Sequence, residues 1–185
     1  MTTIYFIRHA QPNYDNHDDY SRELTEKGLQ DSKDLVKRFE DIKIDAFYSS
    51  PYVRAIDTIK PLAENRQKTI HLVKNFRERK IGNHWIKDFN GFVEKQWTDF
   101  SFRLSDGESL SQVQSRNIQA LETLLKEHPE QTLVVGSHGT ALSAIINYYQ
   151  PAFTYSDFQK IKDVFPWLIT LQFDGNSCIS IAEFQ

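Results

Sequence analysis

The hydrophobic pattern alternates between short apolar runs and longer segments in which apolar residues recur every three or four positions. Four runs rich in β-branched and aromatic residues predict strands at residues 3–7, 45–49, 69–76 and 132–135. Segments of helical period predict helices at residues 25–39, 52–64, 108–128 and 141–149. Pro61 is expected to kink or end the second helix, because proline removes a backbone N–H and clashes with the preceding turn. Strands that alternate with helices are typical of a three-layer α/β domain.

The segment from Arg77 to Gly107 departs from this pattern. It contains six aromatic residues without a clear period, namely Trp85, Phe89, Phe92, Trp97, Phe100 and Phe102. We interpret it as a short cap-like excursion that covers one end of the sheet. Its aromatic side chains are more often core residues than ligand contacts, and an apolar wall above a binding site is the alternative.

The C-terminal part predicts two more strands, at residues 167–173 and 178–184. The turn sequence Asp174-Gly175-Asn176 lies between them, so they can pair as a hairpin. A length of 185 residues suits one domain with a substantial core, and we expect residues 1–185 to form that domain.

Composition and charge narrow the functional classes. Hydrophobic residues make up 39% of the chain and aromatic residues 13%, which argues against disorder. A formal net charge of −3 gives no global field that attracts nucleic acid or an anionic membrane, so neither partner is expected. Cys178 is the only cysteine, which rules out an internal disulfide and a cysteine-rich metal cluster. With no signal-peptide core and no apolar span, we expect a cytoplasmic protein.

Common catalytic signatures are missing from the chain. It has no GxGxxG or GxxxxGK[ST] nucleotide loop, no HExxH metal motif and no GxSxG nucleophile turn. What remains is a set of polar residues at the ends of predicted strands and the starts of predicted helices, where α/β sheets bind their ligands. They are Arg8, His9, Arg54, Glu78 and His138.

Four of these positions suggest an anion site. A neutral imidazole such as His9 has a nucleophilic lone pair near physiological pH, and the flanking Arg8 can bind phosphate oxygens bidentately. His138 follows an apolar strand and precedes a helix, whose free N–H groups favour an anion. Arg54 lies one turn into another helix and is expected to point towards the strand ends. The alternatives are a surface Arg-His pair, a structural role for His138 in capping the helix or bonding to backbone, and a solvated residue at Arg54.

Five short motifs follow one another in order through most of the chain. They are Arg8-His9-Ala10-Gln11, Leu24-Thr25-Glu26-Lys27-Gly28, Ser49-Ser50-Pro51 with Arg54-Ala55, Asp106-Gly107-Glu108-Ser109 and Val134-Val135-Gly136-Ser137-His138-Gly139. Together they resemble the histidine phosphatase superfamily, in its phosphoglycerate mutase-like branch. The resemblance implies an α/β/α sandwich with a mixed, mainly parallel sheet, and a phosphate site at the carboxyl ends of the strands.

The resemblance also implies roles for individual residues. His9 would be the phosphorylated nucleophile, and Arg8, Arg54 and His138 would bind the phosphoryl group. Glu78 would be the general acid, which requires a carboxyl that is protonated when the ester oxygen leaves. The alternative for Glu78 is a surface charge cluster with its basic neighbours. No metal or other cofactor is implied, because the arginines and a protonated His138 would supply the positive charge.

Further phosphate contacts are expected from Gln11, Asn13, Asn16 and Gly139. Asn16 is shifted by one position from the family's usual asparagine, and Asn13 competes for its role. Two departures from the family pattern lie nearby. Ala10 stands where the family most often has glycine, and its methyl group limits how closely the backbone approaches a phosphate. Pro12 replaces the usual threonine, which removes a hydroxyl and an N–H.

We therefore predict a phosphatase that hydrolyses a small-molecule phosphate monoester through a phosphohistidine at His9. A mutase is the alternative within the enzymes. The resemblance argues against it, because mutases of this family usually carry longer additions that shield the intermediate, whereas the excursion here is short and the tail ends soon after the last predicted strand. A binding module that retains the phosphate site without turnover is the alternative outside the enzymes. The presence of both His9 and Glu78 argues against such a module.

Overall fold

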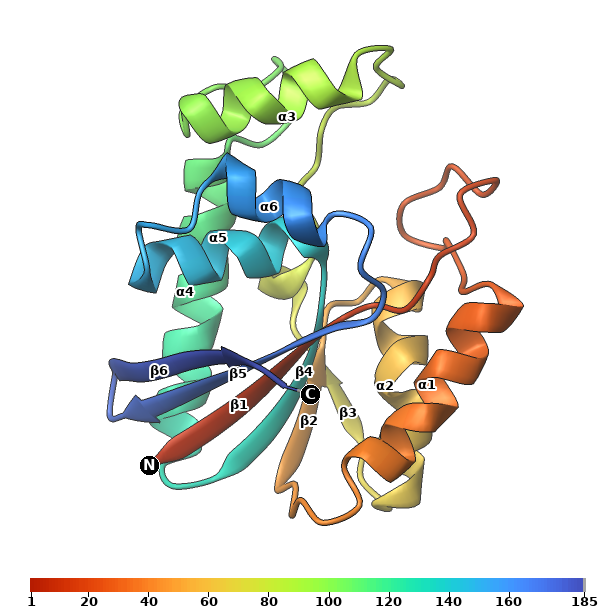
Figure 1. Cartoon of the computed structure of the whole chain (residues 1–185), viewed down its shortest axis with the longest axis vertical. Coiled ribbons are helices and arrows are strands. Elements are labelled where there is room, and N and C mark those ends of the chain that lie inside the picture. The colour runs from red at the N-terminus through yellow and green to blue at the C-terminus, as the bar shows by residue number, and fades with distance from the viewer. Residues whose placement is uncertain (185) are drawn as a thin grey trace.

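A six-stranded sheet lies between two layers of helices in the computed structural model, which describes residues 1–184 (Figure 1). The strands are β1 (Thr2–Arg8), β2 (Ala46–Ser49), β3 (Ile70–Leu72), β4 (Thr132–Ser137), β5 (Trp167–Asp174) and β6 (Ser177–Glu183). Their order across the sheet is β3-β2-β4-β1-β5-β6. The first four strands in this order are parallel, and β5 and β6 add an antiparallel hairpin beside β1. The mixed, mainly parallel sheet predicted from the sequence is confirmed.

The helices are α1 (Glu26–Arg38), α2 (Val53–Asn65), α3 (Phe89–Thr98), α4 (Leu110–Glu127), α5 (Gly139–Tyr149) and α6 (Tyr155–Ile161), with a 3-10 turn, η1 (Lys74–Phe76). α1 and α2 cover one face of the sheet, whereas α4 and α5 cover the other (Figure 1). α3 lies beyond α5 and α6, at the end of the molecule towards which β1 and β4 run (Figure 1). This arrangement is the expected three-layer sandwich.

The side chains of β1 alternate between two cores. Ile4 and Phe6 pack into the cluster that contains α4 and α5, whereas Ile7 packs with α1 and α2. All three side chains are fully buried. A strand that is buried on both faces is apolar at successive positions, which explains why this run shows no polar alternation.

The parallel register places three chain segments side by side at one edge of the sheet. The last residues of β1 and β2 are opposite Ser137 and Gly136 of β4. The residues that follow these three strands are His9, Ser50 and His138. Backbone N–H groups of two of them continue the pairing, because His9 donates to Ser137 O and Ser50 donates to Gly136 O, both at 3.0 Å. The polar ends of three strands therefore meet at one place.

Pro61 was expected either to kink or to end α2, and it does not end the helix. The helix continues to Asn65 with Pro61 inside it. Proline leaves the carbonyl of Asp57, one turn earlier, without its helical donor. The Ser32 hydroxyl of α1 donates to that carbonyl at 2.8 Å. A side chain from the neighbouring helix thus replaces the missing hydrogen bond.

Other boundaries also differ from the pattern. The run at residues 69–76 divides into β3 and η1, and the excursion at residues 77–107 contains α3. α6 has no counterpart among the predicted elements, because seven residues are too few to display a helical period. Among the described residues, none of the helices combines the length and apolar character needed to cross a membrane.

Candidate active site

Five predicted residues come together where β1, β2 and β4 end. We call this group the central site; it consists of Arg8, His9, Arg54, Glu78 and His138. The rings of His9 and His138 lie 5.4 Å apart between centroids. Both histidines and both arginines are 7% exposed or less. Positively charged side chains are rarely buried together in a protein interior, so this grouping marks a candidate anion site.

The His9 imidazole is held in its neutral form. Its Nδ1 lies 2.8 Å from the carbonyl oxygen of Ala10, and because a carbonyl only accepts, Nδ1 carries the proton and Nε2 the lone pair. Burial lowers the pKa of His9 well below its usual range, and the charges of Arg54 and Arg8 lower it further. The lone pair on Nε2 is therefore available at neutral pH.

Arg8 is held by backbone carbonyls rather than by a carboxylate. Nη1 donates to Ile161 O at 2.6 Å and to Val164 O at 3.2 Å, and Nη2 donates to Lys162 O at 2.9 Å. Nε is buried and has no hydrogen-bond partner in residues 1–184. Burial lowers the pKa of Arg8 to about 10, so the guanidinium is charged at neutral pH. A bidentate phosphate contact has to use the Nε side of this guanidinium.

Arg54 lies in the first turn of α2, and its side chain points to the central site as expected. Its positive charge contributes to the lowered pKa of both His9 and His138. Nη2 donates to the carboxylate of Asp19 at 2.8 Å, and Nη1 donates to the Asp19 carbonyl. Asp19 belongs to the loop between β1 and α1. Unlike Arg8, this guanidinium therefore has an acidic partner.

His138 is the N-cap residue of α5, but its side chain makes no capping hydrogen bond, so the helix-capping alternative is wrong. Nε2 lies 2.7 Å from the Ser50 hydroxyl oxygen, which also accepts the Tyr52 N–H at 3.2 Å. Within the described chain the Ser50 hydroxyl has no other acceptor, so we assign its hydrogen to Nε2 and the ring proton of His138 to Nδ1. Nδ1 is buried and has no hydrogen-bond partner within the described chain.

The protein alone favours a neutral His138 ring. Burial lowers the pKa of His138 well below its usual range, and the charge of Arg54 lowers it further. In the protein alone the ring is therefore neutral at physiological pH, and a protonated His138 beside a phosphoryl group stays a prediction. A neutral His138 still offers a hydrogen-bond donor through Nδ1–H.

The Glu78 carboxylate lies at the N-terminus of α5. Oε2 accepts the Thr140 N–H at 3.0 Å, and Oε1 accepts the N–H groups of Ala141 at 3.1 Å and Arg79 at 2.8 Å. The side chains of Arg77 and Arg79 donate to other side chains, at 3.0 and 2.9 Å. Glu78 therefore caps the helix that starts beside His138 and is not part of a surface charge cluster.

Three of the other predicted contacts form hydrogen bonds within the loop that follows β1. Gln11 Oε1 accepts the Thr25 hydroxyl at 2.9 Å, next to the start of α1. The amides of Asn13 and Asn16 both donate to the carboxylate of Glu23, at 2.6 and 2.9 Å. These side chains stabilise the loop that carries Asp19, and the structure does not join them to the central site.

Gly139 is the first residue of α5 and lies against Arg8. A Cβ atom at this position would be 3.0 Å from both Cζ and Nε of the guanidinium, closer than such atoms normally approach. A side chain at this position would displace Arg8. The absence of a side chain at Gly139 therefore leaves room for the Arg8 guanidinium.

The aromatic residues of the excursion divide into two groups. Phe92 and Trp97 are buried and belong to the core, with Phe100 and Phe102 packed against them, as expected for core residues. Trp85, by contrast, is 75% exposed and stacks on His17 with ring centroids 4.8 Å apart. This stack joins the excursion to the loop that follows β1.

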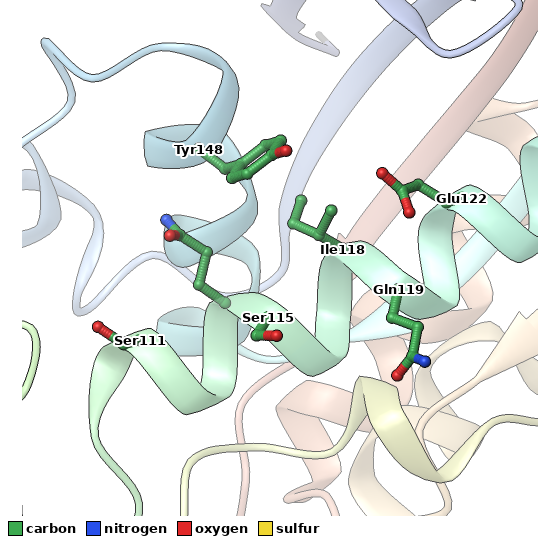
Figure 2. Close-up of a pocket in the computed structure, with 7 residues that line it drawn as sticks. Ser111, Ser115, Ile118, Gln119, Glu122 and Tyr148 are labelled. Carbon is green, nitrogen blue, oxygen red and sulfur yellow. The ribbon is translucent and has the colours of Figure 1, made fainter.

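A groove between α4 and α5 is lined by Ser111, Gln114, Ser115, Ile118, Gln119, Glu122 and Tyr148 (Figure 2). It contains no cationic side chain and none of the predicted site residues, so it does not compete with the central site for a phosphate. Within residues 1–184, no three His, Cys, Asp or Glu side chains are grouped to hold a metal ion.

Two residues near the central site were not singled out from the sequence. Ser50 directly follows a predicted strand, as His9 and His138 do, so the strand-end rule gives a signal for it. Asp19 lies in a loop with several other acidic residues, and nothing local distinguishes it.

Comparisons with known proteins show which family the sequence matches. A sequence model of the histidine phosphatase superfamily (branch 1) matches residues 4–178. The chain is 27% identical to phosphoserine phosphatase 1 of Hydrogenobacter thermophilus over 162 residues, which cover 78% of this chain and 74% of that protein. It is 26% identical to the metal-independent phosphoserine phosphatase of Arabidopsis thaliana over 160 residues, which cover 78% of this chain and 67% of that protein.

The fold is also found among solved structures. The crystal structure of phosphoserine phosphatase from Entamoeba histolytica in complex with 3-phosphoglyceric acid superposes with a TM-score of 0.79 at 23% identity. The match covers 100% of this chain and 98% of that chain. The family and sequence relatives confirm the predicted enzyme type, a phosphoric monoester hydrolase. The chain belongs to the histidine phosphatase superfamily (branch 1).

Proposed function

We propose that this protein hydrolyses small-molecule phosphate monoesters without a metal ion, through a phosphohistidine on Nε2 of His9. The observation that carries the proposal is the neutral His9, whose Nδ1 is held by Ala10 O and whose Nε2 keeps its lone pair beside two buried guanidinium groups. Nucleophile and positive charge are brought together by the fold before substrate binds, which is how enzymes reduce the cost of reorganisation.

The phosphoryl group is bound by two donors that lack other partners and by one that exchanges its partner. Arg8 donates to it through Nε–H, and His138 donates through Nδ1–H. Arg54 gives up its hydrogen bond to Asp19 and donates to the phosphoryl group instead. The charge that builds on the phosphoryl oxygens during transfer is stabilised by these groups, while His9 is positioned in line with the leaving oxygen. Arginine side chains thus supply the positive charge that metal ions supply in other phosphatases.

The reaction has two steps. Nε2 of His9 attacks phosphorus, the bond between phosphorus and the ester oxygen breaks, and protonated Glu78 transfers its proton to the leaving alkoxide. Glu78, now a carboxylate, accepts a proton from a water that attacks the phosphohistidine. The P–N bond then breaks, which releases inorganic phosphate and restores neutral His9.

The relatives support a first choice of substrate. The sequence relatives from Hydrogenobacter and Arabidopsis are both named phosphoserine phosphatases. We therefore propose a small phosphorylated acid of the phosphoserine kind as the class of ester to assay first.

The test is phosphate release from phosphoserine and from nitrophenyl phosphate in the presence of a chelator. We expect turnover by the unmodified protein and a loss on the order of 1000-fold or more in His9→Asn, because nucleophilic catalysis is removed. His84→Asn, which changes an exposed histidine of the excursion, is the matched control and should retain full activity. Equal activity in His9→Asn and His84→Asn would contradict the proposal.

A further inference from the structure

We infer that Phe165 is a positioning residue of the active site, which holds both His9 and Arg8 in the geometry that phosphoryl transfer requires. The inference rests on the proposed function and extends it to residues 161–165, which include none of the predicted site residues. These residues, called here the 161–165 segment, run from the end of α6 to a point just before β5.

The topology of the sheet brings this segment to the end of β1. β5 lies antiparallel to β1, and Trp167 at its start pairs with Arg8. Because antiparallel neighbours run in opposite directions, residues that precede Trp167 lie beside residues that follow Arg8. Figure 1 shows the connection from α6 to β5 passing the end of β1. Phe165 is therefore next to His9, although the two are far apart in the sequence.

The ring of Phe165 contacts both residues. It stacks on the His9 imidazole with centroids 5.6 Å apart and an angle of 28° between the planes. Arg8 Cζ lies 4.0 Å from the centroid of the same ring, which is a cation–π contact. An aromatic face in this position excludes water from the imidazole and restricts the rotation of both side chains.

The rest of the segment sets the direction of the guanidinium. The carbonyl groups of Ile161, Lys162 and Val164 accept hydrogen bonds from the Nη atoms of Arg8. Carbonyls at the C-terminal end of a helix lack intrahelical donors and carry partial negative charge. They stabilise Arg8 without placing a carboxylate in contact with it, so its charge and its Nε–H remain for the phosphoryl group.

Loss of the ring face has two expected consequences. Burial is the largest cause of the lowered pKa of His9, so a more hydrated imidazole would titrate at higher pH. A less restricted Arg8 would bind phosphate more weakly. The charged or titratable groups that act on His9 are Arg8, Arg22, Arg54 and His138, and a change at Phe165 leaves all of them in the protein.

The experiment compares Phe165→Leu with Phe158→Leu in the full chain. Phe158 is a buried residue of α6 that packs on Trp97, with centroids 5.6 Å apart, so its replacement reproduces the loss of packing alone. For each variant, kcat/KM for nitrophenyl phosphate is measured from about pH 4.5 to 8, together with inhibition by inorganic phosphate.

In Phe165→Leu we expect the acid limb of kcat/KM to move up by about half a pH unit or more. We also expect kcat/KM at neutral pH to fall about 10-fold and phosphate to inhibit more weakly. Phe158→Leu should keep the acid limb and the phosphate inhibition of the unmodified protein. Phe165→Tyr retains the ring face and should retain both properties as well.

Three results would overturn the inference. The first is an acid limb and a phosphate inhibition in Phe165→Leu that match those of Phe158→Leu. The second is a shift in Phe165→Tyr as large as that in Phe165→Leu. If Phe165→Leu does not fold, Phe165→Met replaces it, and an unshifted profile in that variant is the third. Turnover that does not depend on His9 would instead contradict the proposed function, so the two failures are distinguishable.

Discussion

Arg54 and Asp19 form an ion pair at the edge of the central site, with Nη2 of Arg54 2.8 Å from Oδ1 of Asp19. The two side chains differ in environment, because Arg54 is 3% exposed and Asp19 is 45% exposed. The Asp19 carboxylate also pairs with Arg22 at 3.2 Å. A phosphate that binds at the central site therefore competes with Asp19 for the Arg54 guanidinium.

Removal of this competitor should strengthen phosphate binding. Asp19→Asn is expected to lower the inhibition constant of inorganic phosphate by about 2- to 5-fold, since a partly exposed ion pair is worth under ~1 kcal/mol. The control is Asp15→Asn, in the same loop, because the Asp15 side chain forms no hydrogen bond or ion pair with residues 1–184. Weaker phosphate inhibition in Asp19→Asn than in Asp15→Asn would show that Asp19 orients Arg54 rather than competing with substrate.

Gly139→Ala tests the space in front of Arg8. The added methyl group would lie 3.0 Å from Cζ and Nε, so the guanidinium has to move. Displacement of the Arg8 guanidinium from its phosphate-binding position should lower kcat/KM about 10-fold or more. The protein should still fold, because alanine is a good helix former. Gly82→Ala is the control, because the atoms nearest to its methyl group belong to the Leu104 and Asp106 side chains, away from Arg8. Equal steady-state kinetics for the two variants would argue against the predicted role of Arg8.

Ser50→Ala tests how His138 is held. The substitution removes the hydroxyl that lies 2.7 Å from Nε2, and a buried nitrogen without its partner costs about 1–3 kcal/mol. We expect kcat to fall about 10-fold, which corresponds to ~1.4 kcal/mol. Ser49→Ala is a close control, because the buried Ser49 hydroxyl has no hydrogen-bond partner in the described chain. Comparable losses of kcat in both variants would mean that packing, rather than His138 orientation, is being measured.

Stability should fall as the pH falls below about 6.5, the usual pKa of histidine. Burial, with the charge of Arg54, lowers the pKa of both His9 and His138 in the folded state, so both stay neutral there. In the unfolded state they take up protons below about pH 6.5, and the state that binds more protons is favoured as pH decreases. Each histidine then contributes a loss of up to about 1.4 kcal/mol per pH unit.

The measurement is the melting temperature between about pH 7.5 and 5.5, a range above the usual carboxylate titrations. His9→Asn combined with His138→Asn should show a smaller decrease in Tm than the unmodified protein. A decrease of the same size in both proteins would mean that the two histidines are not kept neutral by the fold.

The sequence specifies much of this structure through local signals. Thr25 and Ser109 stand at the N-caps of α1 and α4, and each side chain accepts the backbone N–H of the residue three positions later. The placement of polar residues at strand ends predicted where His9 and His138 would meet. These features depend on neighbours in the chain or on the general rule that parallel strands end at one edge.

Other contacts depend on topology and are not visible in a local pattern. Arg8 and the Ile161 carbonyl that accepts from it are 153 positions apart, and the contact exists because β5 returns beside β1. The helix containing Pro61 continues because Ser32, on another helix, supplies a hydrogen bond. The protonation state of His138 likewise depends on burial, which a single sequence does not specify residue by residue.

Trapping of the phosphorylated enzyme tests the central claim most directly. The protein is mixed with phosphate-labelled ester, quenched in alkali within the first turnovers, and examined for acid-labile phosphate on the chain. With labelled nitrophenyl phosphate, whose leaving group departs without a proton from Glu78, we predict label on His9 of the unmodified protein, more label in Glu78→Gln because water attack is slowed, and none in His9→Asn. Turnover without acid-labile label in either the unmodified protein or Glu78→Gln, or label that persists in His9→Asn, would contradict phosphoryl transfer to His9.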